Sequence, residues 1–159
     1  MWSPCRSGCD LVRVTITREF GFDMGHCLPD HEGGCYRPHG HRYRFEVTLA
    51  GAVDFDMPGD PENGMLVDFG RLKEVVARQV IDVFDHRFVM SRHDPRATAM
   101  QQVFNRNDDH GGPGVILLNA PPTAEFLATT IAQLLASDYP ELSTVRVWET
   151  PTCSATWTH

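Results

Sequence analysis

One cysteine and three histidines lie close together near the start of the chain. His26, Cys35, His39 and His41 fall within sixteen residues of one another. His39 and His41 alternate at the start of a segment that we expect to be a strand, so their rings point to one side. A histidine from the preceding strand can complete a site of three ring nitrogens. Three protein ligands with one open position are typical of catalytic zinc. The pattern therefore predicts that His26, His39 and His41 bind a metal.

Two roles are open to Cys35 beside such a metal. A thiol close to a divalent cation loses its proton easily. The thiolate could become a fourth ligand, which would close the site and make it structural, or stay free and act as a base. An extended loop through Pro38 would hold the sulfur about 10 Å or more from His39. That distance favours the free thiolate, but the sequence does not decide between the two roles.

Two further groups could take part in chemistry. Asp85 precedes His86 at the end of a predicted helix, and an aspartate that orients an imidazole makes it a candidate acid or base. The alternative is a histidine stabilised by the helix dipole. Glu149 ends a predicted strand, where its carboxylate could accept two parallel hydrogen bonds from a planar donor pair, such as that of a pterin or guanine. A charged residue at a rim is the alternative for Glu149.

The composition describes one ordinary globular domain. The chain has 159 residues, of which 42% are apolar and 22% charged, and this length can bury a sizeable core. Because no run of eighteen apolar residues occurs, we expect no membrane span. The formal net charge of −7 leaves no excess positive charge for phosphates, so no nucleic-acid partner is expected. Arg37, Arg42 and Arg44 form either a solvated strand face or a local contact for an anionic substrate.

The five cysteines give no disulfide framework, since their number is odd and their spacing irregular. Residues 1–10, which include Cys5 and Cys9, lack the apolar stretch of a secretory signal, and we expect them to form a flexible tail. Reduced thiols in the cytoplasm are therefore predicted.

The strands that must position the histidines are visible as alternation. Residues 11–22 and 41–51 alternate apolar and polar side chains, which predicts two strands that each have one buried face. Residues 145–149 and 154–158 predict a hairpin near the end of the chain.

Two helices are expected between these pairs of strands. Apolar residues at helical spacing follow Asp68 and Thr123, and both of these residues are good N-caps. The order ββααββ predicts a single α+β domain over residues 11–159, with a four-stranded antiparallel sheet and two helices on one face. Residues 91–114 are predicted to form a flexible insertion, and residues 114–118, which follow it, could add a short strand. The uncovered face and edges of the sheet favour a homo-oligomer.

Six motifs between Val12 and Trp157 are informative when they are taken together. They are Phe22-x3-His26, Cys35-x3-His39-Gly40-His41, Val67-Asp68-Phe69-x2-Leu72-Lys73, Asp85-His86, Pro122-Thr123-Ala124-Glu125 and Trp148-Glu149-Thr150. Jointly they resemble the family of 6-pyruvoyl- and 6-carboxy-tetrahydropterin synthases. The resemblance implies the tunnelling fold (T-fold), in which subunits assemble around a central barrel, as a trimer-based hexamer or a tetramer, with active sites at subunit interfaces.

The resemblance also implies a role for each candidate residue. It implies that His26, His39 and His41 bind zinc and that Cys35 is the base that abstracts a proton. By the same resemblance, Asp85 and His86 form the proton relay. It further implies that substrate contacts come from Glu149, which anchors the pterin, and from Thr123 and Arg37.

The spacing between Cys35 and His39 separates the branches of the family. Three intervening residues resemble the bacterial carboxy-forming enzymes of queuosine biosynthesis, whereas the pyruvoyl-forming branch has a longer spacer. The resemblance thus implies a carbon–oxygen and carbon–carbon lyase that converts 7,8-dihydroneopterin triphosphate to 6-carboxy-5,6,7,8-tetrahydropterin, acetaldehyde and triphosphate. The alternative is 6-pyruvoyl-tetrahydropterin synthase, which eliminates triphosphate. The chain departs from the family in its insertion at about 91–114 and in Cys27, where the family has a basic or polar residue.

Two alternatives outside this family stay open. The pattern Gly33-x5-His39-x-His41-x4-Glu46 nearly reproduces the metal motif of a cupin, with Glu46 as a fourth ligand, although two amphipathic helices count against an all-β barrel. A zinc-stabilised interaction module without activity is the other alternative, and it predicts unfolding when the metal is removed.

Overall fold

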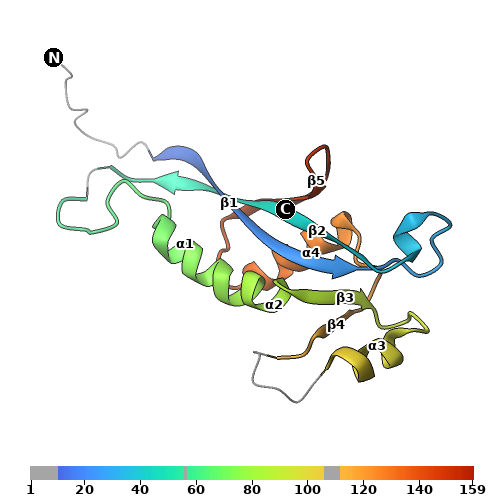
Figure 1. The fold of residues 1–159 in the computed structure, drawn as a ribbon. Helices are drawn as coiled ribbons and strands as arrows, with labels where there is room; N and C mark the ends of the chain where they lie inside the picture. Colours follow the sequence, from blue (N-terminus) through green and yellow to red (C-terminus); the bar gives the residue numbers. More distant parts are fainter. Residues whose placement is uncertain (1–10, 56, 106–111) are drawn as a thin grey trace.

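The computed structural model describes residues 11–55, 57–105 and 112–159 of the chain (Figure 1). Its strands are β1 (Val12–His26), β2 (His39–Val53), β3 (Arg87–Ser91), β4 (Val115–Leu118), β5 (Leu142–Thr150) and β6 (Cys153–Thr158). A short 3-10 turn, η1 (Gly34–Tyr36), precedes β2. One continuous helical run consists of α1 (Phe69–Val76), the π-helical turn η2 (Ala77–Ile81) and α2 (Asp82–Phe84). Two separate helices follow, α3 (Ala97–Phe104) and α4 (Ala124–Leu135).

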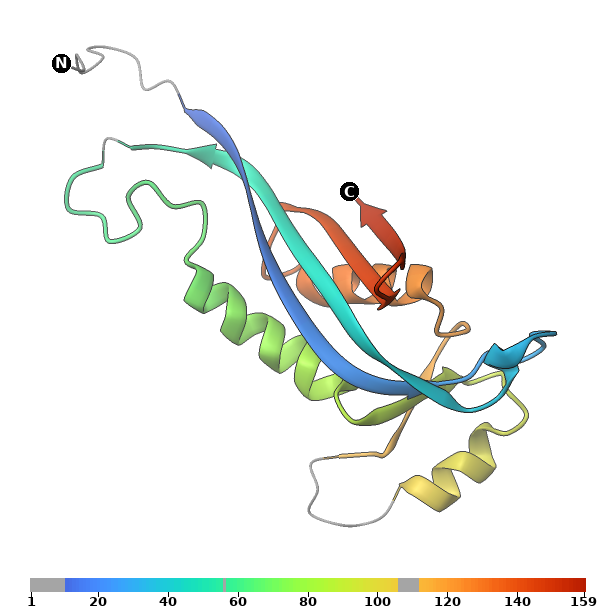
Figure 2. The same cartoon turned by 45° about the horizontal axis from the view of Figure 1, so that its top comes forward.

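The strands form one mixed sheet in the order β4-β3-β1-β2-β5-β6. The four predicted strands pair antiparallel as expected, β1 with β2, β2 with β5 and β5 with β6. The two longest, β1 and β2, curve together along the molecule (Figure 2). This part of the predicted architecture is confirmed.

The prediction of only four antiparallel strands is wrong in extent, because β3 and β4 add a parallel extension beside β1. β3 spans five residues and contains the apolar run Phe88–Met90, while β4 reads Val-Ile-Leu-Leu. Strands of a parallel sheet are covered on both faces and lose the alternation that identifies a half-buried strand. Periodicity therefore could not identify β3, although the short strand expected at 114–118 is present.

Helix α3 lies inside the segment that the sequence analysis describes as an insertion. It spans Ala97–Phe104, and its Ala97 packs in a small apolar cluster with Cys27, Met90 and Val115. Residues 106–111 of the insertion and the predicted tail, residues 1–10, lie outside the described residues.

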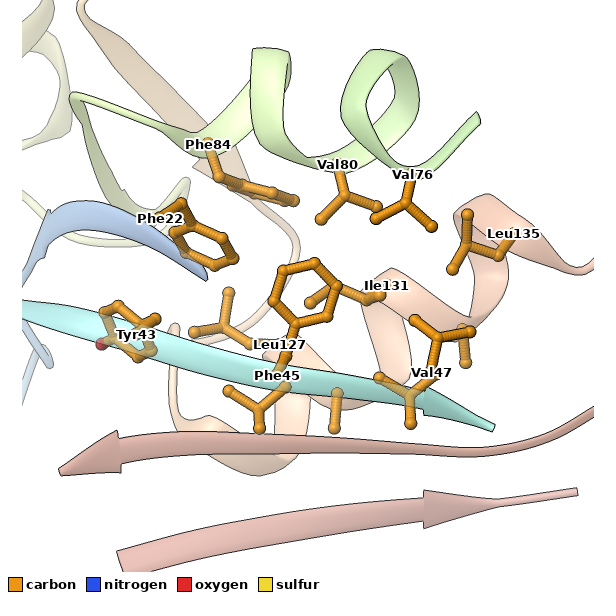
Figure 3. Packing of buried hydrophobic residues seen from close by; sticks show 14 of the residues in the cluster. Phe22, Tyr43, Phe45, Val47, Val76, Val80, Phe84, Leu127, Ile131 and Leu135 are labelled. Carbon is orange, nitrogen blue, oxygen red and sulfur yellow. The ribbon is translucent and has the colours of Figure 1, made fainter. Parts of the chain in front are cut away.

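The main core lies between one face of the sheet and two helical layers, α1–α2 and α4 (Figure 3). Both helices begin at their predicted caps, since Asp68 Oδ1 accepts from Arg71 N at 2.9 Å and Thr123 Oγ1 from Phe126 N at 3.3 Å. Alternate residues of β1 and β2 face these helices, and Tyr43 and Phe45 are fully buried there. The aromatic rows end where the histidines begin, so the packed core fixes the strands that carry them.

No helix within the described ranges is both long and apolar enough to cross a membrane.

Candidate metal centre and active site

The register of β1 and β2 brings the three predicted histidines together. His26 lies directly opposite His39, and Met24 lies opposite His41, so alternation puts all three imidazoles on the helix-covered face of the sheet. One ring nitrogen from each histidine lies within 4.8 Å of the others. His26 Nε2 and His39 Nε2 are 3.1 Å apart. The cluster has the spacing of a metal site formed by three residues.

Backbone carbonyls orient two of these rings. His26 Nδ1 lies 3.0 Å from Pro122 O, and His39 Nδ1 lies 2.7 Å from Arg37 O. Since a carbonyl only accepts, each Nδ1 carries the proton and each Nε2 keeps its lone pair for a ligand. Three imidazoles that each offer one ring nitrogen to the same point are a donor set that suits Zn²⁺. The sequence could not identify these carbonyls, because every residue has one.

The same geometry excludes the cupin alternative. Glu46 occupies an even position of β2, whereas His39 and His41 occupy odd positions, so the Glu46 side chain points to the opposite face. The mixed sheet covered by helices also differs from an all-β barrel.

His26 is held neutral by its surroundings. The residue is fully buried, and burial lowers the pKa of His26 from its ordinary value against the opposing effects of the Pro122 hydrogen bond and Glu149. A neutral ring can bind a metal without first losing a proton.

This shift predicts a pH dependence for the metal-free protein. The unfolded chain protonates His26 near pH 6.5, whereas the folded chain resists protonation, so falling pH favours the unfolded state. Stability is expected to be full above about pH 6.5 and to decline between about pH 6.5 and 5. The midpoint of urea unfolding, measured across this range, should fall less in His26→Gln than in the wild type. The exposed His93→Gln is the matched control and should follow the wild type.

Glu149 and Tyr43 adjoin the histidines. Glu149 Oε1 lies 3.3 Å from His26 Nε2 and 3.9 Å from His41 Nε2, and the Tyr43 hydroxyl donates to the same oxygen at 3.4 Å. Burial and the nearby Glu149 carboxylate raise the pKa of Tyr43, so its hydroxyl stays protonated. The carboxylate therefore lies beside the metal centre with one oxygen held by a hydroxyl. Sequence reasoning missed Tyr43, because a buried tyrosine on an alternating strand is typical of a core.

Cys35 lies in a pocket of about 290 Å³ that Thr123, Glu149 and Cys153 also line. Its side chain is partly exposed, and its carbonyl accepts from Leu28 N at 2.8 Å. The Cys35 sulfur is not among the ligand atoms that lie within 4.8 Å of one another in the described part of the chain. The structure thus brings Cys35, Thr123 and Glu149 together beside the metal centre. Cys153 also lines this pocket. The sequence predicts no role for it, because it lies in a hairpin near the end of the chain.

Asp85 and His86 form a close pair in the turn between α2 and β3, beside β1. His86 Nδ1 lies 2.8 Å from Asp85 Oδ2, and Asp85 Oδ1 accepts from the backbone of Asp23 at 2.9 Å. Partial burial opposes ionisation, but hydrogen bonds from Asp23 and His86 lower the pKa of Asp85. His86 lines a pocket with Asp23, Gly40 and Arg42, whereas Cys35 lines a different one. Within one chain, the structure does not bring the predicted relay to Cys35.

Arg37 directs only its backbone to the centre. Its carbonyl orients His39, while the residue itself is exposed at the end of η1.

Sequence comparison matches residues 15–159 to the family described as 6-pyruvoyl tetrahydropterin synthase. The chain is 34% identical over 142 residues to the 6-carboxy-5,6,7,8-tetrahydropterin synthase of Haemophilus influenzae, covering 86% of this chain and 93% of that protein. It is 32% identical over 145 residues to the protein of the same name from Rickettsia bellii, covering 88% and 96%.

Solved structures share the fold. A protein of Wolinella succinogenes superposes with a TM-score of 0.72 at 21% identity, covering 93% of this chain and 99% of that one. The 6-pyruvoyl tetrahydropterin synthase of Caenorhabditis elegans superposes with a TM-score of 0.66 at 24% identity, covering 94% and 97%.

Proposed function

This chain belongs to the 6-pyruvoyl tetrahydropterin synthase family of lyases, and from that membership we propose that it is a zinc-dependent 6-carboxy-tetrahydropterin synthase. Its substrates are 7,8-dihydroneopterin triphosphate and one water molecule, and its products are 6-carboxy-5,6,7,8-tetrahydropterin, acetaldehyde and triphosphate. The observation that carries the proposal is the cluster of three imidazoles beside Glu149, adjoining the Cys35 pocket. The names of the relatives at 32–34% identity support the carboxy-forming branch. We further propose that the enzyme acts in the cytoplasm, in queuosine biosynthesis.

Each residue then has a defined task in the reaction. The three histidines would hold Zn²⁺, which would supply a Lewis acid for the acidification of a side-chain carbon of the substrate. The Cys35 thiolate accepts the proton from that carbon. Glu149 accepts hydrogen bonds from the amine and ring N–H of the pterin, which orients the side chain toward the three imidazoles. Thr123 lines the same pocket. We propose that the exposed side chain of Arg37 meets the triphosphate.

The proton relay requires a second subunit. Asp85 holds His86, which returns a proton to the substrate, yet His86 and Cys35 line different pockets of one chain. We therefore place His86 of one subunit beside Cys35 of another in a homo-oligomer, a trimer-based hexamer or a tetramer. The edge strands β4 and β6 leave backbone groups unpaired by this sheet, which favours association between copies.

A product assay tests the proposed reaction. Zinc-loaded protein is incubated with 7,8-dihydroneopterin triphosphate, and the pterin is identified by mass spectrometry. We expect 6-carboxy-5,6,7,8-tetrahydropterin together with acetaldehyde. A 6-pyruvoyl product would move the enzyme to the other branch, and an unchanged substrate would contradict the lyase activity.

Replacing Glu149 with glutamine should weaken substrate binding more than it slows turnover. The change removes a charged acceptor of two hydrogen bonds, so KM should rise about 10- to 100-fold. Steady-state kinetics measure this effect, and Glu74→Gln on the exposed side of α1 is the control. A KM equal to that of the control would remove Glu149 from the pterin site.

A further inference from the structure

A polar cluster centred on the buried residues Cys27 and Asp94 adjoins the loop that carries Cys35. It joins three parts of the chain, which are the end of β1, the loop after it and the start of the α3 segment. Its members are Cys27, Tyr36, Asp94 and Arg96. Cys27 and the segment around Asp94 are the two places where the sequence departs from the family pattern.

Arg96 is held rigidly within this cluster. Its Nε donates to Asp94 Oδ1 at 2.9 Å and its Nη2 to Asp94 Oδ2 at 2.7 Å, which is the paired geometry of arginine with a carboxylate. The Asp94 side chain is fully buried, and Cys27 Sγ donates to Asp94 Oδ2 at 3.7 Å. Asp94 Oδ1 also accepts from the backbone of Arg96. Because these bonds restrict the Arg96 side chain, its remaining N–H group can hold a third group in a fixed position.

The group that Arg96 holds is Tyr36, the neighbour of Cys35. Arg96 Nη1 donates to the Tyr36 carbonyl at 2.7 Å, and the guanidinium lies 4.3 Å from the centre of the Tyr36 ring. The carbonyls on either side are also engaged, that of Cys35 by Leu28 N and that of Arg37 by His39 Nδ1. Three successive carbonyls of this turn thus accept hydrogen bonds from Leu28, just after β1, from Arg96 and from a candidate metal ligand.

We propose that Arg96, anchored by buried Asp94, is a positioning residue that fixes the Cys35–Arg37 turn against the metal centre. The Asp94–Arg96 pair and its hydrogen bond to the Tyr36 carbonyl form this clamp. It sets the position of the Cys35 sulfur on one side of Tyr36 and the orientation of the His39 ring on the other. Its effect on catalysis rests on the proposed function of Cys35, whereas its effect on the loop does not.

Hydrogen exchange of the folded, zinc-loaded protein tests the clamp directly. Arg96→Gln alone would leave the Asp94 carboxylate buried without its partner, so the main variant is the double change Asp94→Asn with Arg96→Gln, which removes both charges. Arg96→Lys keeps the charge without the paired donors. Arg92→Gln removes an exposed arginine from the same segment and is the matched control.

We expect the amides of residues 28–38 to exchange at least about tenfold faster in the double variant, while those of β5 stay unchanged. Arg96→Lys should lie between the wild type and the double variant, and Arg92→Gln should match the wild type. Unchanged protection of residues 28–38 in the double variant would overturn the proposal. Equal loss of protection in β5 would overturn it too, since it would show a general loss of stability.

Kinetics separate this inference from the proposed reaction. Misplacing the base should lower kcat by about 10- to 100-fold. KM should change less than kcat, because of the proposed substrate contacts only Arg37 lies in the clamped turn, whereas Glu149 and Thr123 lie outside it. If the wild type does not turn over the pterin substrate, the proposed function fails, and the exchange result still decides whether Arg96 holds the turn.

Discussion

Replacing His39 with alanine is expected to abolish both metal binding and activity while the fold survives. The change removes one of three nitrogen ligands, and the two remaining ones cannot hold the ion in a defined geometry. Loss of the Lewis acid should lower kcat/KM by at least about 10³-fold, since such polarisation contributes several kcal/mol. His39 lies beyond the end of the apolar core, so the unfolding midpoint of the metal-free variant should stay close to that of the metal-free wild type. Metal content by mass spectrometry and steady-state kinetics measure the two losses.

The matched control is His93→Ala, which removes an exposed histidine outside the cluster and should keep both metal and activity. Full activity of His39→Ala without any divalent metal would contradict the role of the site. Removal of the metal by a chelator also tests the non-enzymatic zinc module, for which the fold itself depends on the ion. Here the core of β1, β2, β5, α1–α2 and α4 packs without the histidines, so activity should be lost first and the fold should remain.

The metal centre could be predicted from the sequence because its geometry follows from strand periodicity alone. His39 and His41 are two residues apart on a strand, and the register with β1 then has only to bring His26 opposite. The helix starts at Asp68 and Thr123 were predictable for a similar reason, since a cap acts within three residues of its own position.

Contacts between distant segments could not be predicted in this way. β3 lacks alternation because its apolar run is covered on both sides, and its pairing with β1 depends on the whole sheet. The Asp94–Arg96 pair lies in a polar, glycine-containing segment that reads as flexible, yet it is ordered through Cys27 and Tyr36, which are about sixty to seventy residues away. In the proposed oligomer, the position of His86 relative to Cys35 depends on contacts between subunits, which the pattern of one chain does not encode.

Replacing Cys35 with alanine should leave the metal in place and remove most of the activity. Cys35 lines the pocket with Thr123 and Glu149, and its sulfur is not among the clustered ligand atoms of the described residues, so three imidazoles should still hold the ion. Loss of a positioned base typically costs about 10²- to 10⁴-fold in rate, and we expect kcat to fall in that range. Because Cys35 is proposed to act on a proton and not to hold the pterin, KM should change little. Metal analysis and steady-state kinetics on one preparation distinguish the two roles that the sequence left open.

Cys153→Ala is the matched control, because that thiol lines the same pocket from the start of β6 but has no assigned task. If Cys35 were a fourth ligand, its removal would instead open a closed site, and the metal would be held more weakly and lost on dialysis. Normal turnover by Cys35→Ala with the metal retained would show that another group removes the proton.

In that case the alternative base is His86 of a neighbouring subunit. Mixing inactive His86→Ala protein with Cys35→Ala protein would then leave the rate per active subunit unchanged. If both residues act at one shared site, the mixed oligomers should instead regain activity, because some interfaces would combine an intact Cys35 with an intact His86.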